Sequence, residues 1–136
     1  MEYNAGAGGI VLNRKKQILL IANPGMLLGF PKGREEAGEK PLETAKREIY
    51  EESGIKDLKL LEDLGEYKRT SLNADGTENP DIIKTIHMFL FRTSETNLKP
   101  ADKDIGGVRW VDKEEVVGLL QHKKDKEFFN KIRDKI

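Results

Sequence analysis

Three glutamates in the segment PKGREEAGEKPLETAKREIYEESGI, residues 31–55, have the types and spacing of a cation site. On a helix, Glu48, Glu51 and Glu52 would share one arc of about 100°. Like charges at this spacing destabilise a helix by a few tenths of a kcal/mol per pair, and by more near a core. Mg²⁺ or Mn²⁺ would remove this repulsion, since both favour carboxylate oxygen and leave positions for phosphate oxygens and water. The alternative is a solvated charged face, because 35% of the chain is charged.

The helix that must position these glutamates has start and stop signals. Pro41 suits a first turn and Gly54 suits the position after a last turn, which predicts a helix over about 41–53. Glu52 then lies beside the apolar stripe of this helix and Glu51 lies farthest from it. The stripe consists of Leu42, Ala45 and Ile49. We therefore expect the carboxylates to border the core.

Short β-rich runs alternate with helical patterns over the rest of the chain, which predicts one α/β domain over residues 1–136. The predicted strands are GGIVLN (8–13), QILLIA (17–22), a short strand at 27–30, LEDLGEYKRT (61–70), DIIKTIHMFLFRT (81–93) and GGVRWV (106–111). Asp112 is expected to cap a helix in KEEVVGLLQH (113–122), and KDKEFFNKIRDKI (124–136) repeats apolar residues at a helical period.

Composition narrows the classes of partner. Lys plus Arg and Asp plus Glu number 24 each, so the formal net charge is zero. Long-range attraction to nucleic acid or membrane is therefore not expected. The chain has no cysteine, which excludes thiolate metal sites and cysteine nucleophiles. No apolar run approaches a membrane span. We expect a cytoplasmic protein, monomer or homodimer, whose partner is a small molecule.

The segment GREEAGEKPLETAKREIYEESGI, residues 33–55, resembles the Nudix box, with each of its nine specified positions filled. The similarity extends through AGAGGIVL, FPKG and VRWVDKEE, and so over nearly the whole chain. The resemblance implies an α/β fold, a Nudix-type α/β/α sandwich with a mixed β-sheet and a catalytic loop-helix-loop. It also implies hydrolysis of a phosphoanhydride in a nucleoside diphosphate-linked substrate, with Mg²⁺ or Mn²⁺ as cofactor.

The resemblance implies roles for individual residues of the box. Glu39 would orient Arg47 beside the metal site. Glu48 or Glu52 is favoured as the general base. The implied metal ligands are Glu48, Glu51, Glu52 and the backbone carbonyl of Lys32, while Gly33 and Gly54 would form the tight turns at the two ends.

Within the family, FPKG followed by LETAKREIYEESGI is similar to the diadenosine polyphosphate hydrolases of small bacterial type. This similarity adds Asp104 as an extra acidic ligand or base, with an ordinary surface loop as the alternative. Recognition of the base is expected to differ from that in some of these hydrolases, since Met88 occupies a strand position where they stack adenine on tyrosine. The candidate substrate-binding residues are Lys32, Arg34, Lys84 and His87, with Tyr67 as a possible stacking group, each weighed against a structural or solvated role.

Two other hypotheses remain open from the sequence. One is a different Nudix pyrophosphohydrolase, acting on a nucleoside triphosphate, a 5′-triphosphorylated RNA end or a diphosphoinositol polyphosphate. The other is a non-catalytic nucleotide-binding module, against which the intact cluster of Glu48, Glu51 and Glu52 argues.

Overall fold

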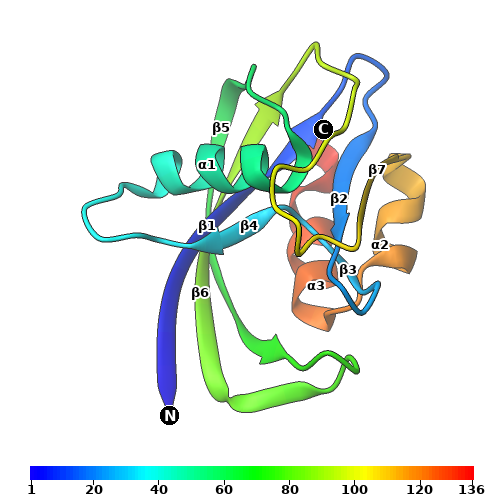
Figure 1. Cartoon of the computed structure of the whole chain (residues 1–136). Helices are drawn as coiled ribbons and strands as arrows, with labels where there is room; N and C mark the ends of the chain where they lie inside the picture. Colours follow the sequence, from blue (N-terminus) through cyan, green and yellow to red (C-terminus); the bar gives the residue numbers. More distant parts are fainter.

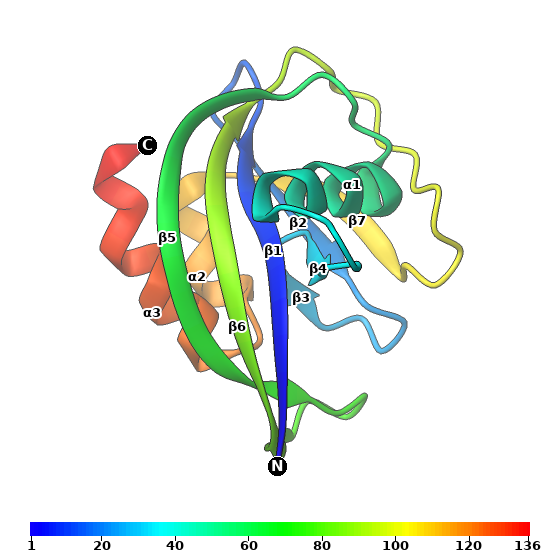
Figure 2. The same cartoon turned by 90° about the vertical axis from the view of Figure 1, so that its left-hand side faces the viewer.

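A computed structural model describes residues 1–136 and consists of one sheet of seven strands with helices on both faces (Figures 1 and 2). The strands are β1 (Glu2–Leu12), β2 (Ile18–Ala22), β3 (Leu28–Gly29), β4 (Lys32–Arg34), β5 (Lys59–Leu72), β6 (Glu78–Arg92) and β7 (Gly107–Val111). The helices are α1 (Pro41–Ser53), α2 (Val116–Leu119) and α3 (Lys123–Ile132), with 3₁₀ turns at Lys113–Glu115 and Arg133–Lys135. None of these helices has the length and apolarity needed to cross a membrane.

The sheet has the order β3-β2-β1-β6-β5, with β4 added to β1 and β7 added to β2. β1 and β6 run parallel from Glu2 opposite Ile82 to Leu12 opposite Arg92, and every other pairing is antiparallel. The first two strands pair as an antiparallel hairpin. The predicted α/β class with a mixed sheet is therefore confirmed.

Each face of the sheet has its own apolar cluster, as strand alternation requires. In Figure 2, α1 lies on one side of the sheet and α2 and α3 lie on the other. The stripe predicted on α1 packs on the first face, where Ala45 and Ile49 are fully buried beside Phe89 and Phe91. Phe128 and Phe129 of α3 pack on the second face.

The boundaries of α1 agree with the prediction because both of its ends are satisfied locally. The Glu43 carboxylate accepts a hydrogen bond from the Lys40 backbone N–H at 2.9 Å, and Pro41 opens the helix. At the other end, Gly54 has a φ of 84° and donates its N–H to the Tyr50 carbonyl at 2.7 Å.

The prediction for the segment after β7 was wrong in its length and its cap. Lys113–Glu115 is a 3₁₀ turn and only Val116–Leu119 is α-helical. The Asp112 side chain does not cap this turn, because it instead accepts a hydrogen bond from Gln17 Nε2 at 3.2 Å. The final predicted helix also becomes a 3₁₀ turn after Ile132.

Gly54→Ala is expected to destabilise the protein by more than about 1 kcal/mol, because an L side chain is strained at positive φ and its Cβ would meet the Lys99 carbonyl oxygen. The matched control is Gly118→Ala in α2, where a methyl group has no neighbour within 4 Å. That change should be neutral or stabilise by about 0.5–1 kcal/mol. Chemical denaturation of both variants measures this, and equal losses of stability would contradict the assignment.

Candidate active site

The Arg47 guanidinium is the centre of the loop and helix that hold the glutamates. Its Nε and Nη2 donate to the two carboxylate oxygens of Glu39 at 2.7 and 3.0 Å. Its Nη1 donates to Glu48 Oε1 at 2.8 Å and lies 3.3 Å from Glu51 Oε2. Nη2 also donates to the Arg34 carbonyl oxygen at 2.8 Å. Arg47 thus joins β4, the loop after it and one side of α1.

Glu39 is fixed from several directions. Besides Arg47, it accepts hydrogen bonds from the Thr44 hydroxyl at 2.7 Å and from the Glu36 backbone N–H at 2.9 Å. The hydrogen bond from Arg47 is the main reason that the pKa of Glu39 falls to about 2, and the other two lower it further. Glu39 therefore keeps its charge, and with it the orientation of Arg47, at neutral pH.

Glu48 lies directly against Gly33. A Cβ at Gly33 would overlap the Glu48 carboxylate, so only glycine leaves room for it. This corrects the prediction that Gly33 forms a tight turn, because it lies in strand β4 and has no positive φ. Burial raises the pKa of Glu48, while the hydrogen bond and charge of Arg47 oppose that shift.

Glu52 lies deeper and contacts the chain before the box. Its Oε1 accepts the Lys32 backbone N–H at 3.0 Å. Burial raises the pKa of Glu52 to about 8, although the Lys32 ammonium opposes the shift. Burial, followed by the Arg69 charge, lowers the pKa of Lys32 to about 8. The site therefore holds buried charges of both signs that lack full compensation.

The loop before β7 brings a further carboxylate to α1. The carbonyl of Glu51, near the open C-terminal end of the helix, accepts the backbone N–H groups of Ala101 at 3.0 Å and Asp102 at 2.8 Å. Asp102 is among the charges that raise the pKa of Glu48 and Glu52. The sequence indicated Asp104 of this loop and not Asp102, since only the pairing of the loop with α1 distinguishes the two.

The residues fit a hard divalent cation by the chemistry of their donors. No three carboxylate, histidine or cysteine side chains are grouped closely enough to hold an ion. Arg47 instead holds Glu48 and Glu51, while Glu52 turns to the Lys32 N–H. The side chains that could bind a cation are all carboxylates, which Mg²⁺ and Mn²⁺ prefer as ligands. Burial disfavours the charged forms of Glu48 and Glu52, so a bound cation would stabilise them.

A cleft of about 330 Å³ opens beside Glu52. Asp102 and Asp104 line it on the carboxylate side, and Lys32 and Lys84 contribute positive charge. The remaining wall is largely aliphatic, with Ile21, Pro24, Leu27, Leu28, Leu72 and Ile105 among its residues. Carboxylates, positive side chains and an apolar wall thus meet in one depression.

The structure separates Arg34 from this cleft. Its side chain is 68% exposed and pairs with Glu2 Oε2 at 3.0 Å. It lines a smaller hollow of about 70 Å³, which Lys32 and Lys84 border from the other side.

The predictions that His87 faces the cleft and that Tyr67 stacks on a base were wrong. His87 lies three residues from Lys84 on a strand and therefore points to the opposite face, where its Nε2 is 2.7 Å from Asp63 Oδ1. The Tyr67 ring stacks on Phe128 with centroids 4.5 Å apart, and its hydroxyl donates to Asp125 at 2.6 Å. The Tyr67 side chain therefore has a structural role, because its ring and its hydroxyl are both engaged within the protein.

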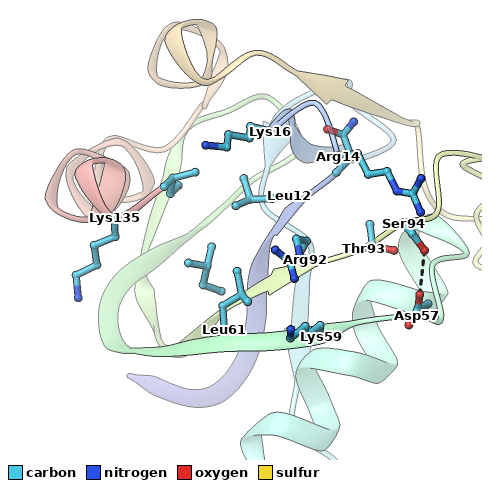
Figure 3. Close-up of a pocket in the computed structure, with 13 residues that line it drawn as sticks. Leu12, Arg14, Lys16, Asp57, Lys59, Leu61, Arg92, Thr93, Ser94 and Lys135 are labelled. Atoms are coloured by element: carbon cyan, nitrogen blue, oxygen red, sulfur yellow. Dashed lines mark hydrogen bonds between the residues drawn. The ribbon is translucent and has the colours of Figure 1, made fainter.

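A second and larger pocket, of about 680 Å³, lies away from the glutamates (Figure 3). We call it the basic pocket, because its charged side chains are Arg14, Lys16, Lys59, Arg92 and Lys135, with Asp57 as the one carboxylate. Asp57 accepts a hydrogen bond from Ser94 at 3.1 Å. Leu12, Leu61 and Leu90 supply apolar surface. A pocket with one carboxylate cannot perform the chemistry predicted for the box glutamates.

Comparisons with known proteins identify the family of the chain. A family model described as NUDIX domain matches residues 2–132. The chain is 32% identical over 110 residues to a putative 8-oxo-dGTP diphosphatase of Bacillus subtilis, which covers 80% of this chain and 66% of that protein. It is 31% identical over 77 residues to an RNA pyrophosphohydrolase of Bartonella bacilliformis, which covers 49% of this chain and 45% of that protein. The chain thus spans between about half and two thirds of these relatives.

A solved structure shows the same fold over almost the whole chain. The Ap4A hydrolase of C. elegans, in a binary complex, aligns over 96% of both chains with a TM-score of 0.78 and 18% sequence identity. At that identity the likeness concerns the fold alone.

Glu39→Gln should lower the melting temperature at neutral pH but not at pH 2. The pKa of Glu39 in the folded protein, about 2, lies below its ordinary value of 4.5, so its charge stabilises the fold above pH 4.5. That stabilisation is lost as the pH falls from 4.5 to 2. Melting curves across this range should show the two proteins converging. Glu35→Gln, in the same loop but outside the Arg47 network, should follow the wild type, and a constant gap for Glu39→Gln would contradict the assignment.

Proposed function

The chain belongs to the Nudix family, because the family model matches residues 2–132. We therefore propose that it is a single-domain pyrophosphohydrolase that acts on a nucleoside diphosphate-linked substrate. The observation that carries this proposal is that the carboxylate of Glu52 and the side chains of Lys32 and Lys84 line one cleft, with Glu48 close by against Gly33. This pairing suits a substrate that carries phosphates and a divalent cation together.

Glu48 and Glu52, with Glu51 and Asp102 close by, are the residues that would hold the cation, Mg²⁺ or Mn²⁺. When bound, such a cation neutralises phosphate oxygens and makes a water more acidic. The Lys32 carbonyl and Asp104 remain further candidate ligands from the sequence.

The residues of this chain would perform the remaining tasks of the reaction. Arg47, fixed by Glu39, orients Glu48. We propose Glu48 or Glu52 as the base that accepts the proton of the attacking water. Lys32 and Lys84 would balance charge on the phosphates that are not attacked.

We propose a dinucleoside polyphosphate, such as diadenosine tetraphosphate, as the substrate. Its several phosphates match a cleft that contains both carboxylates and basic side chains. Its base would meet a largely aliphatic wall. The one aromatic residue of this wall, Phe30, is only 2% exposed, Tyr67 is occupied by Asp125 and Phe128, and Met88 is fully buried. A wall without an aromatic platform would discriminate weakly among bases.

A 5′-triphosphorylated RNA end is the second candidate substrate. The relative in Bartonella bacilliformis is described as an RNA pyrophosphohydrolase, and the basic pocket offers positive charge outside the cleft. RNA binding through that pocket would show a steep salt dependence, since phosphate contacts release counterions. A dinucleotide carries fewer phosphates, so its binding in the cleft would depend on salt less steeply.

A substrate panel tests the proposal. It should include dinucleoside polyphosphates, NTPs, ADP-ribose and triphosphorylated RNA, each with Mg²⁺ or Mn²⁺ and each with excess EDTA. We expect ATP and AMP from diadenosine tetraphosphate, with no turnover in EDTA because the carboxylates require the cation. Chromatography of the products identifies the bond that is cleaved. Full activity in EDTA would overturn the mechanism, and turnover of RNA alone would replace the substrate.

Glu52→Gln should retain the fold but lose about 10² to 10⁴ in kcat, because it removes a ligand or base while keeping size. Glu35→Gln is the matched control, since Glu35 lies in the box loop outside the Arg47 network. It should lose less than about tenfold because exposed charges are screened. Steady-state kinetics with the best substrate measures both, and equal effects would mean that Glu52 is not part of the catalytic site.

A further inference from the structure

Arg69 of β5 is a buried arginine whose hydrogen-bonding capacity is mostly unused. Its side chain is 6% exposed, yet it lines the same cleft as Glu52 and Lys84. Nη1 donates to Asp125 Oδ2 at 2.7 Å, and this is its one side-chain hydrogen bond. Nε is buried without any partner, the one such side-chain atom in the protein. A guanidinium has five N–H donors, so a partner for the others is missing from the chain itself.

Asp125 is held so firmly that it fixes the position of Arg69. It is 1% exposed and lies in the first turn of α3, where the helix N-terminus favours a negative charge. Its second oxygen accepts the Tyr67 hydroxyl at 2.6 Å, and the Tyr67 ring is stacked on Phe128. The ion pair therefore holds the guanidinium at the cleft wall instead of releasing it to solvent.

Two lysines share this wall with Arg69. A methyl group on Gly29 would lie 3.7 Å from Asp125 Oδ2 and 3.9 Å from Lys32 Nζ, which places the ammonium beside the ion pair. Burial and then the Arg69 charge lower the pKa of Lys84. Three cations thus gather around one carboxylate, Asp125, and the remaining acids of the cleft lie at the proposed metal site. Asp125 and Glu52 offset part of this positive charge, but the Arg69 Nε still has no partner in the chain.

We propose that Arg69, held by Asp125, binds a phosphate of the substrate at the inner end of the cleft and, with Lys84 and Lys32, selects substrates with long polyphosphate chains. A planar guanidinium binds two oxygens of one phosphate, which would satisfy donors that the protein leaves free. The identity of the substrate rests on the proposed function, whereas the anion site rests on the contacts of Arg69. No feature of sequence spacing indicated this residue.

The variant that tests this role removes both charges of the pair together. Arg69→Gln with Asp125→Asn avoids the buried unpaired charge that either single change would leave, and it retains hydrogen-bonding groups at both positions. Arg109→Gln is the matched control, because Arg109 also lies on a strand but is exposed and lines neither the cleft nor the basic pocket. Lys84→Gln is a second test of the same wall, in case the double variant does not fold.

Isothermal titration with inorganic tripolyphosphate in EDTA measures the anion site without turnover. We expect the double variant to bind at least tenfold more weakly than wild type, Lys84→Gln at least threefold more weakly, and Arg109→Gln within twofold. KM for diadenosine tetraphosphate should rise at least tenfold in the double variant while KM for ADP-ribose changes less than threefold. Unchanged tripolyphosphate affinity in the folded double variant, or an equal loss in Arg109→Gln, would overturn the inference.

The outcomes also separate this inference from the proposed function. Weaker tripolyphosphate binding by the variants in a protein that hydrolyses none of the dinucleotides would support the anion site and reject the substrate. Turnover of diadenosine tetraphosphate with wild-type KM in the double variant would support the substrate and reject a binding role for Arg69. In the latter case the pair with Asp125 only joins β5 to α3.

Discussion

The interaction on which the site depends is the hydrogen bonding of one guanidinium, that of Arg47, to carboxylates from two segments of the chain. It fixes Glu39 in the loop and Glu48 on α1, and it reaches the carbonyl of Arg34 in β4. Without it, the hydrogen bond from Thr44 to Glu39 would be the main link between this loop and the helix, and the acidic residues would repel one another. Gly33 then supplies the space into which the Glu48 carboxylate fits. The Arg47 guanidinium and the absence of a Cβ at Gly33 thus determine where the carboxylates lie.

The cleft holds acidic and basic groups whose charges are incompletely compensated. Burial disfavours both ionised Glu52 and protonated Lys32, which are neighbours, so each group lacks part of the compensation that water would give. In the function that we propose, a metal would compensate the carboxylates and a phosphate chain the basic groups. A metal–polyphosphate complex would then suit the cleft better than either component, and Arg69, held by Asp125, adds to its positive charge.

Local signals predicted the local parts of this arrangement. Pro41 and Gly54 bounded α1 correctly because helix ends are decided by adjacent residues. The environment of Arg69 could not be predicted, since Asp125 is 56 residues away and only packing of α3 on β5 joins them. The prediction that His87 faces the cleft was wrong because it followed from residue type, whereas strand alternation turns His87 and Lys84 to opposite faces of the sheet. Asp102 and Asp104 could be told apart only by the hydrogen bonds of their loop to Glu51.

The parallel pairing of β1 with β6 has a consequence for how the protein folds. Residues Glu2–Leu12 can pair with β6 only when Ile82–Arg92 have been synthesised, so the centre of the sheet closes late. Until then the edge of β1 that faces β6 is unpaired. The C-terminal half of β1 is strongly apolar, so this exposed edge favours aggregation. α1 packs mainly on β1 and also on β6. Catalytic competence should therefore emerge in the last step of folding, which would make recovery of activity a stricter report of refolding than recovery of helix.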